Sequence, residues 1–187
     1  MPYLYPDFAS VAAIRQEVSK RLSLEIILNT PGEVTWLIIQ KNPSKANEAI
    51  SDHTINRVLN YLFLNRNRYK VLESVGRVVF LNLIPLYETY SSRLAHRNAP
   101  LEDIQNLRII DTYLQPGSPC IIAWGNPPTG LAKPYAQLSE KVLKLLDSTG
   151  NPTYRVGELT RLGYPRHGQI WGYADPLQRM DPLRKRC

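Results

Sequence analysis

Two short and nearly uninterrupted apolar runs constrain the fold of this chain more than any other feature of the sequence. They are RVVFLNLI at residues 77–84 and PCIIAWG at residues 119–125. A run of this length without alternating polar residues is typical of a strand that is covered on both faces. The sequence therefore predicts a central sheet with helices on either side.

The segments around these runs alternate between helical and extended patterns. Helical spacing of apolar residues marks 52–65, 101–114 and 136–146, and strand-like composition marks 22–28, 34–40 and 154–159. This alternation predicts an α/β fold, a three-layer α/β/α sandwich with a mainly parallel central sheet and right-handed crossovers. A chain of 187 residues is long enough for one substantial core, so we expect a single domain over residues 1–187.

The N-terminal part of the chain carries two further expectations. Phe8, Val11 and Ile14 recur at a spacing of three, which predicts a short helix over residues 8–21. A turn cluster at residues 29–32 separates the two strand-like segments on either side of it. This arrangement predicts that these two strands form a hairpin.

The net charge of the chain favours a polyanionic partner. Lys and Arg outnumber Asp and Glu by 23 to 16, which gives a net charge of +7 and a pI of about 9.5, although many proteins without such a partner have similar values. Residues 161–187 carry six basic residues and two acidic ones, so four of the seven excess positive charges lie there. We expect residues 172–187 to form a basic C-terminal tail.

Cysteine usage and hydropathy indicate the compartment. Cys120 lies inside an apolar run and Cys187 ends the chain, which is neither a disulfide framework nor a C-x-x-C pair. The first residues lack the pattern of a secretory signal, and no stretch approaches the roughly 18 apolar residues of a membrane span. We therefore expect a cytoplasmic protein in a reducing compartment.

Polar residues follow the predicted strands where each strand ends. Residues 40–44 (QKNPS), Asn82, Trp124 and a late loop that contains His167 occupy these positions. Taken singly, each has an ordinary explanation as a turn, a satisfied core amide, a packed ring or an exposed loop histidine. Because the carboxyl ends of parallel strands meet at one edge of a sheet, their order predicts a ligand site at that edge.

The order of these motifs resembles the uracil-DNA glycosylase superfamily. There the first loop reads G-x-D-P or G-x-N-P, the second strand ends in Asn, the third ends in W-G or similar, and a late loop reads H-P-S. A closer resemblance, over roughly residues 22–171, is to a family of bacterial and phage proteins catalogued as a domain of unknown function. It rests on N-P-S-x-A (42–46), D-x-T-x-x-R (52–57), N-L-x-P (82–85), A-W-G (123–125) and G-x-P-R-H (163–167).

The resemblance implies roles for individual residues. Asn42 would hold or polarise the attacking water, Asn82 would read the flipped base with its amide, and His167 would donate a hydrogen bond to the departing base. These residue types suit the reaction, because cleavage of an N-glycosidic bond leaves negative charge on the base and positive charge on the sugar. Asp52 has two open readings: a carboxylate that supplies what Asn42 lacks, or a purely structural N-cap of the following helix.

The remaining expected contacts surround these residues. We expect substrate contacts from Gln40, Pro43, Ser44, Asn82, Tyr87 and Trp124, and DNA contacts from Lys41, Lys45, Arg57, Arg166, Arg184, Lys185 and Arg186. The resemblance implies no metal and no cofactor.

Departures from the superfamily pattern point away from uracil itself. The first motif begins with Gln40-Lys41 instead of glycine, no aromatic residue follows it within residues 46–55, and His167 is followed by Gly168. A site without that stacking wall would admit a bulkier base, which favours a modified pyrimidine, such as a hypermodified cytosine or uracil of phage DNA.

The resemblance therefore implies a monofunctional DNA glycosylase in anti-phage defence. It would act as a monomer, flip the modified base out of double-stranded DNA and leave an abasic site. Two alternatives remain open from the residues alone: a non-catalytic nucleic-acid-binding module, and a hydrolase or transferase that acts on free nucleotides.

Overall fold

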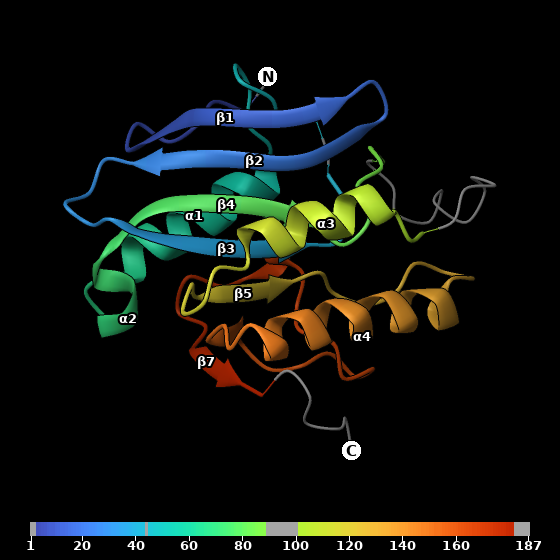
Figure 1. Ribbon diagram of the computed structural model, residues 1–187. Helices are drawn as coiled ribbons and strands as arrows, with labels where there is room; N and C mark the ends of the chain where they lie inside the picture. The colour runs from blue at the N-terminus through green and yellow to red at the C-terminus, as the bar shows by residue number, and fades with distance from the viewer. Residues whose placement is uncertain (1–2, 44, 89–100, 182–187) are drawn as a thin grey trace.

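The structure is a computed structural model that describes residues 3–43, 45–88 and 101–181. Seven strands of the described residues form one sheet in the spatial order β1-β2-β4-β3-β5-β6-β7 (Figure 1). The strands are β1 (Ala9–Glu17), β2 (Lys20–Leu28), β3 (Val34–Gln40), β4 (Val75–Asn82), β5 (Cys120–Ala123), β6 (Thr153–Val156) and β7 (Leu177–Met180). The helices are α1 (His53–Asn65), α2 (Lys70–Glu73), α3 (Ile104–Tyr113) and α4 (Ala132–Ser148), with a 3-10 turn, η2, at Gly168–Ile170.

The sheet is mixed. The four central strands, β4, β3, β5 and β6, pair in parallel, whereas β1 with β2, β2 with β4, and β6 with β7 pair antiparallel. The α/β class predicted from the sequence is thus confirmed, but the parallel part is confined to the centre and the sheet as a whole is not mainly parallel.

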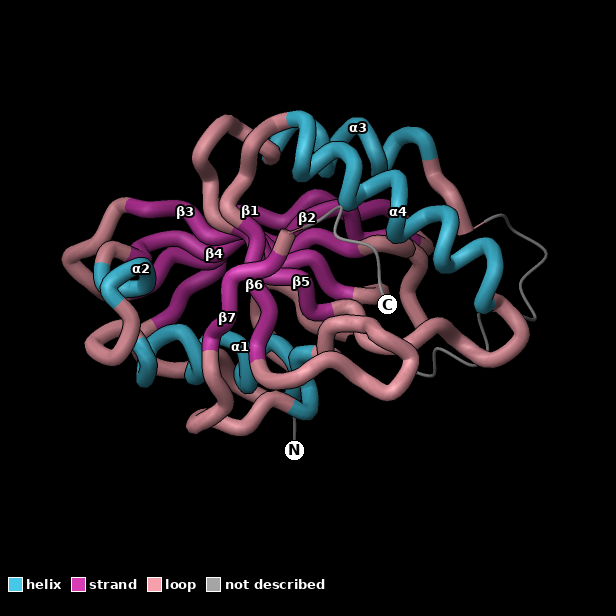
Figure 2. Tube along the Cα trace, turned by 90° about the horizontal axis from the view of Figure 1, so that it is seen from below, coloured by secondary structure: helices cyan, strands magenta, loops and turns pink. Residues whose placement is uncertain are grey.

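Apolar side chains cover the central strands on both faces. Leu37, Ile39 and Leu81 belong to one buried cluster with residues of α3 and α4, and Ile38 and Phe80 belong to a second cluster with residues of α1. Figure 2 shows α3 and α4 on one side of the sheet and α1 and α2 on the other. Since successive residues of a strand point to opposite faces, two covered faces require the continuous apolar runs seen in the sequence.

The helix predicted over residues 8–21 is wrong. This segment forms the edge strand β1 and the turn into β2, and its pairing with β2 shifts register between Val11 and Ala13 and again between Arg15 and Gln16. An extra residue at such a bulge changes the spacing of core-facing residues from two to three. The spacing from Val11 to Ile14 therefore imitates a helix.

The predicted hairpin between residues 22–28 and 34–40 is also wrong, because β4 lies between β2 and β3. The connection at residues 29–33 passes tightly over the start of β4. A Cβ atom on Gly76 would lie 1.8 Å from the carbonyl oxygen of Gly32. A side chain at either position would therefore collide with the backbone. Glycine at these positions permits the crossing.

The other predicted elements are present with shifted ends. All three helical patterns correspond to helices, α1, α3 and α4, and the two apolar runs form β4 and β5. Within the segment predicted as a basic tail, β7 pairs with β6, and residues 182–187 lie outside the described residues. No helix in the described part of the chain is long and apolar enough to cross a membrane.

Candidate functional site

The carboxyl ends of β3, β4 and β5 meet at one edge of the sheet. Gln40, the last residue of β3, is the register partner of Asn82 on β4 and of Ala123 on β5. The loops that follow β3 and β4 are joined by hydrogen bonds from Leu83 N to Gln40 O and from Ile84 N to Lys41 O, both of 2.8 Å. The structure thus brings together strand ends that are far apart in the sequence.

This edge contains the switch point of the sheet. The chain leaves β3 toward α1 on one face, and it leaves the neighbouring β5 toward α4 on the other face (Figures 1 and 2). Loops that diverge in this way leave room for a ligand at the carboxyl ends of the strands. The topology therefore favours the same edge that the sequence motifs indicate.

The loop that carries His167 packs directly onto the end of β5. Gly125 N donates a hydrogen bond of 3.0 Å to Pro165 O, and a Cβ atom on Gly125 would lie 3.0 Å from the Cβ atom of His167. On the other side of the histidine, a Cβ atom on Gly168 would lie 2.8 Å from Cγ2 of Val58 in α1. Two close approaches hold His167 between β5 and α1.

His167 is held as a neutral hydrogen-bond donor. Burial, together with the positive charge of Lys41, lowers the pKa of His167 to about 4, although the negative charge of Asp52 opposes this shift. Its Nδ1 atom accepts a hydrogen bond of 3.2 Å from Gln169 N. An acceptor at Nδ1 places the proton of the neutral ring on Nε2, so His167 offers an N–H donor at neutral pH.

Asp52 caps α1, which agrees with one of its two readings. Its Oδ1 atom accepts a hydrogen bond of 2.8 Å from Ile55 N. The carboxylate nevertheless acts electrostatically on both His167 and Arg21. Asp52 therefore both caps α1 and places a negative charge close enough to act on His167 and Arg21.

The amide of Asn42 is oriented by two carbonyl groups. Its Nδ2 atom donates to Pro43 O at 3.1 Å and to Glu88 O at 2.5 Å. Because the donor end of the amide is engaged, the acceptor Oδ1 is turned away from these two carbonyls. An acceptor fixed in this way is suited to holding a water molecule.

Unpaired buried polar atoms concentrate at this edge. Among the described residues, six buried side-chain nitrogen or oxygen atoms have no hydrogen-bond partner: Arg21 Nε, Trp36 Nε1, Gln40 Nε2, Asn82 Oδ1, Asn106 Oδ1 and Trp124 Nε1. All except Trp36 lie at or beside the carboxyl ends of the central strands. Gln40 and Asn82 are paired in register on adjacent strands, so they present an unpaired donor and an unpaired acceptor on the same face. Buried polar groups are normally satisfied, so this cluster indicates a missing ligand or water.

The other residues predicted to contact substrate lie at different depths. Pro43 is buried in the loop after β3, and Trp124 is fully buried in the core cluster next to α3 and α4. Tyr87 is partly buried, and its hydroxyl donates to Gln16 Oε1 at 2.8 Å. Ser44 lies outside the described residues.

The predicted DNA contacts are also distributed unevenly. Lys45 is exposed, whereas Lys41 is partly buried near His167 and burial lowers its pKa. The guanidinium of Arg57 lies over the ring of Tyr173, 4.7 Å from its centroid, and Arg166 Nη1 lies 3.6 Å from Asp175 Oδ2. Arg184, Lys185 and Arg186 lie outside the described residues.

Two residues of this edge were missed by sequence reasoning. Arg21 is only 1% exposed, and its Nη1 atom donates to Ala46 O at 2.9 Å. Asn106 of α3 donates to Asn82 O at 2.8 Å. Nothing in the sequence distinguishes an arginine at the start of a strand or an asparagine in a helix from a surface residue.

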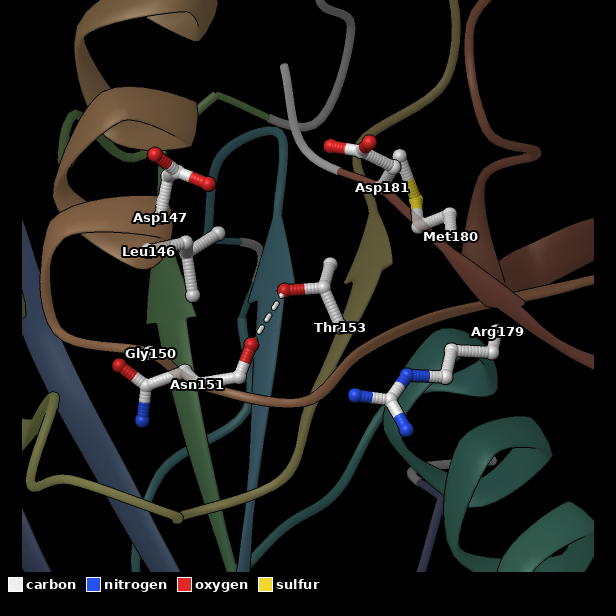
Figure 3. A pocket seen from close by; sticks show the side chains of 8 residues that line it. All are labelled: Leu146, Asp147, Gly150, Asn151, Thr153, Arg179, Met180 and Asp181. Atoms are coloured by element: carbon white, nitrogen blue, oxygen red, sulfur yellow. Dashed lines mark hydrogen bonds between the residues drawn. The ribbon is translucent and has the colours of Figure 1, made fainter. Parts of the chain in front are cut away.

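A hollow of about 500 Å³ lies at the opposite edge of the sheet, near the start of β6 (Figure 3). Asn151 and Thr153 line it together with Asp147, Arg179 and Asp181. Asn151 donates to Gln115 O at 2.7 Å and to Ser118 O at 2.9 Å, and Thr153 Oγ1 donates to Asn151 O at 3.0 Å. Since its buried polar groups are used within the protein, we place the candidate site at the carboxyl edge. In the described ranges, no group of three or more His, Cys, Asp or Glu residues could hold a metal ion.

Comparison with known proteins identifies the family. A family model described as "Protein of unknown function (DUF1643)" matches residues 21–168. The match spans most of the chain, so this protein belongs to that family. No curated protein and no solved structure matches the chain.

Proposed function

We propose that this protein is a DNA glycosylase that hydrolyses the N-glycosidic bond of a modified pyrimidine and leaves an abasic site. The observation that carries the proposal is the position of three side chains relative to the strand ends: Asn42 follows β3, Asn82 ends β4, and His167 packs against Gly125 after β5. Among the described residues, several buried polar atoms at this edge lack a hydrogen-bond partner. The three side chains supply an acceptor for water, an amide for a base and a neutral donor for a leaving group.

His167 would stabilise the leaving base. Breaking the bond places negative charge on an oxygen of the base, and a preorganised N–H donor in a desolvated site stabilises that charge without any reorganisation. The lowered pKa keeps the ring neutral, and the hydrogen bond that Nδ1 accepts from Gln169 N leaves the ring proton on Nε2, which would donate to the base. The Lys41 ammonium nearby would add positive potential.

Asn42 and Asp52 would act on the sugar side of the bond. The oriented amide of Asn42 would hold the attacking water through Oδ1. The negative charge of Asp52 would favour the positive charge that develops on the sugar, even though its carboxylate also caps α1.

The proposal includes a distant membership of the uracil-DNA glycosylase superfamily, with its three-layer α/β/α arrangement. Support comes from the four parallel strands at the centre of the sheet, from helices on both sides of it, and from the order of the strand-end motifs. Lys45 is exposed in the loop after β3 and would contact duplex DNA, whereas Arg57 of α1 would have to leave the ring of Tyr173 to do so.

The substrate class follows from the departures in the motifs. Residues 46–55 offer no Phe, Tyr or Trp side chain to stack on uracil, and among the described residues Gln40 Nε2 and Asn82 Oδ1 have no hydrogen-bond partner. We infer a pyrimidine with an additional polar group, of the kind found in modified phage DNA, and a role in defence against such phages.

A panel of duplexes that each contain one modified pyrimidine tests the proposal. After incubation with the protein and a chelator, alkali should cleave the strand at the modified base, and the His167→Ala variant should give little product. Tight DNA binding without any alkali-labile site would favour a binding module. Release of base only from free nucleotides would favour a nucleotide hydrolase.

A further inference from the structure

Arg21 carries a buried positive charge that the proposed reaction does not use. The residue is 1% exposed, its Nη1 atom donates to Ala46 O at 2.9 Å, and its Nε atom has no partner among the residues that the structure describes. An arginine is almost never fully buried unless it is paired with a negative charge. Among the described residues, no carboxylate lies within ion-pair distance of Arg21.

The surroundings of Arg21 compensate this charge only in part. Asp52 acts on it electrostatically, but the same carboxylate caps α1. Tyr5 and Tyr87 also face it, and burial raises the pKa of both, that of Tyr5 to about 12, so both hydroxyls stay neutral. The interior beside Asn82 is therefore positive and has an unused donor.

Arg21 is a direct neighbour of the residue expected to read the base. Asn82 Nδ2 donates to Arg21 O at 3.1 Å, and Arg21 N donates to Pro85 O at 2.9 Å. The guanidinium reaches under the loop after β3 through its bond to Ala46. A base held by Asn82 would lie next to this side chain.

We propose that Arg21 determines specificity by binding an anionic, carboxylate-like group on the base that Asn82 reads. The guanidinium fork matches a carboxylate in charge and geometry. A phosphate of the DNA backbone is a less suitable ligand, because it stays at the protein surface whereas a flipped base is carried into the interior. This inference rests on the proposed function and gives its substrate class.

Binding to uncleavable DNA tests the inference without any need for turnover. Duplexes would carry 5-carboxyuracil, 5-hydroxymethyluracil or an abasic analogue, the first two on a 2′-fluoroarabino sugar that resists hydrolysis. The wild-type protein should bind the carboxyl duplex about 10- to 100-fold more tightly than the hydroxymethyl duplex, as expected for one charge-assisted pair. In Arg21→Gln this ratio should fall to about one, and Arg21→Lys should keep part of it.

Two controls separate a specificity role from a structural one. Arg77 is another strand arginine, ion-paired to Glu25 at 2.8 Å near the start of β4, and Arg77→Gln should leave the ratio unchanged. Thermal unfolding of Arg21→Gln and Arg21→Lys shows whether each variant is folded. If Arg21→Gln does not fold, the wild-type ratio and that of Arg21→Lys decide the question.

The outcomes are distinct. A wild-type ratio near one, or an unchanged ratio in folded Arg21→Gln, overturns the inference. Equal weakening of the abasic duplex assigns Arg21 to a backbone phosphate, which also overturns it. Selective binding of the carboxyl duplex without base release from any cleavable DNA overturns the proposed function but keeps this subsite.

Discussion

The two edges of the sheet differ in whether a buried asparagine amide has all its hydrogen-bond partners within the described residues. At the amino edge, Asn151 is 5% exposed and both ends of its amide are used, since Nδ2 donates to two carbonyls and Oδ1 accepts from Thr149 Oγ1. At the carboxyl edge, Asn82 is completely buried, and within the described part of the chain it donates one side-chain hydrogen bond of 3.1 Å and leaves Oδ1 without a partner. Asn82 is the last residue of β4, and Asn151 lies just before the first residue of β6.

This difference separates a structural amide from a candidate ligand-binding amide. A satisfied buried amide stabilises the fold, because removing it would leave its partners unpaired. An unsatisfied one costs stability and is retained only where something else, such as water or a ligand, completes it. The hollow at the amino edge is therefore a weaker candidate site than the edge that contains Asn82.

The largest expected effect is on catalysis at the carboxyl edge. His167→Ala should slow base release by roughly 10² to 10³ because it removes the donor to the leaving base, with little change in DNA affinity. Single-turnover rates on the preferred duplex measure this effect. Gln169→Ala is a matched control, since Gln169 bonds to His167 Nδ1 through its backbone N–H, which the substitution keeps. Equal loss in both variants would contradict a specific role for the imidazole.

Exchange of the two asparagines tests the comparison directly. Asn151→Ala leaves the carbonyls of Gln115 and Ser118 unpaired, so it should lower the free energy of unfolding by about 3 kcal/mol. Asn82→Ala loses one hydrogen bond but also removes an unpaired oxygen, so its loss should be about 1 kcal/mol. Urea unfolding measures both. If Asn82→Ala destabilises as much as Asn151→Ala, the distinction between the edges is wrong.

Stability should also depend on pH through His167. Its pKa is about 4 in the folded protein, while the unfolded chain has a value near 6.5, so the unfolded state binds more protons between these values. The contribution of His167 to the free energy of unfolding is therefore complete above pH 6.5 and is lost as the pH falls toward 4. With allowance for the partial exposure of the residue, we expect a loss of about 2 kcal/mol. Urea unfolding across this range should show the slope in the wild type and a smaller slope in His167→Gln.

The smallest expected effect is that of removing the amide of Asn42, which would hold the attacking water. Asn42→Ala should lower turnover about 10-fold while the affinity for modified DNA is retained, because holding water matters mainly in the transition state. Parallel measurements of kcat and of binding to uncleavable DNA check this. Asn60→Ala, which alters an amide that bonds to Asn56 O within α1, provides the control. A loss of affinity equal to the loss of turnover would assign Asn42 to binding instead.

Local patterns in the sequence were sufficient to predict the central elements and the shared edge of the sheet at which their polar strand-end residues lie. The continuous apolar runs at β4 and β5 reflect burial on both faces, and the cap at Asp52 reflects a hydrogen bond three residues away. Strand-end logic alone placed Gln40, Asn82 and Trp124 at one edge. Periodicity and capping depend on neighbours within one or two turns, so a single chain displays them directly.

Only the tertiary structure decided the pairing of the outer strands and the state of the site residues. β4 separates β2 from β3, a bulge makes β1 look helical, and β7 pairs with β6. The burial of Arg21 and the neutral, Nε2-protonated state of His167 likewise arise from the residues packed around them. Strand partners, desolvation and buried hydrogen bonds depend on contacts between residues distant in sequence, and these contacts exist only once the chain has folded.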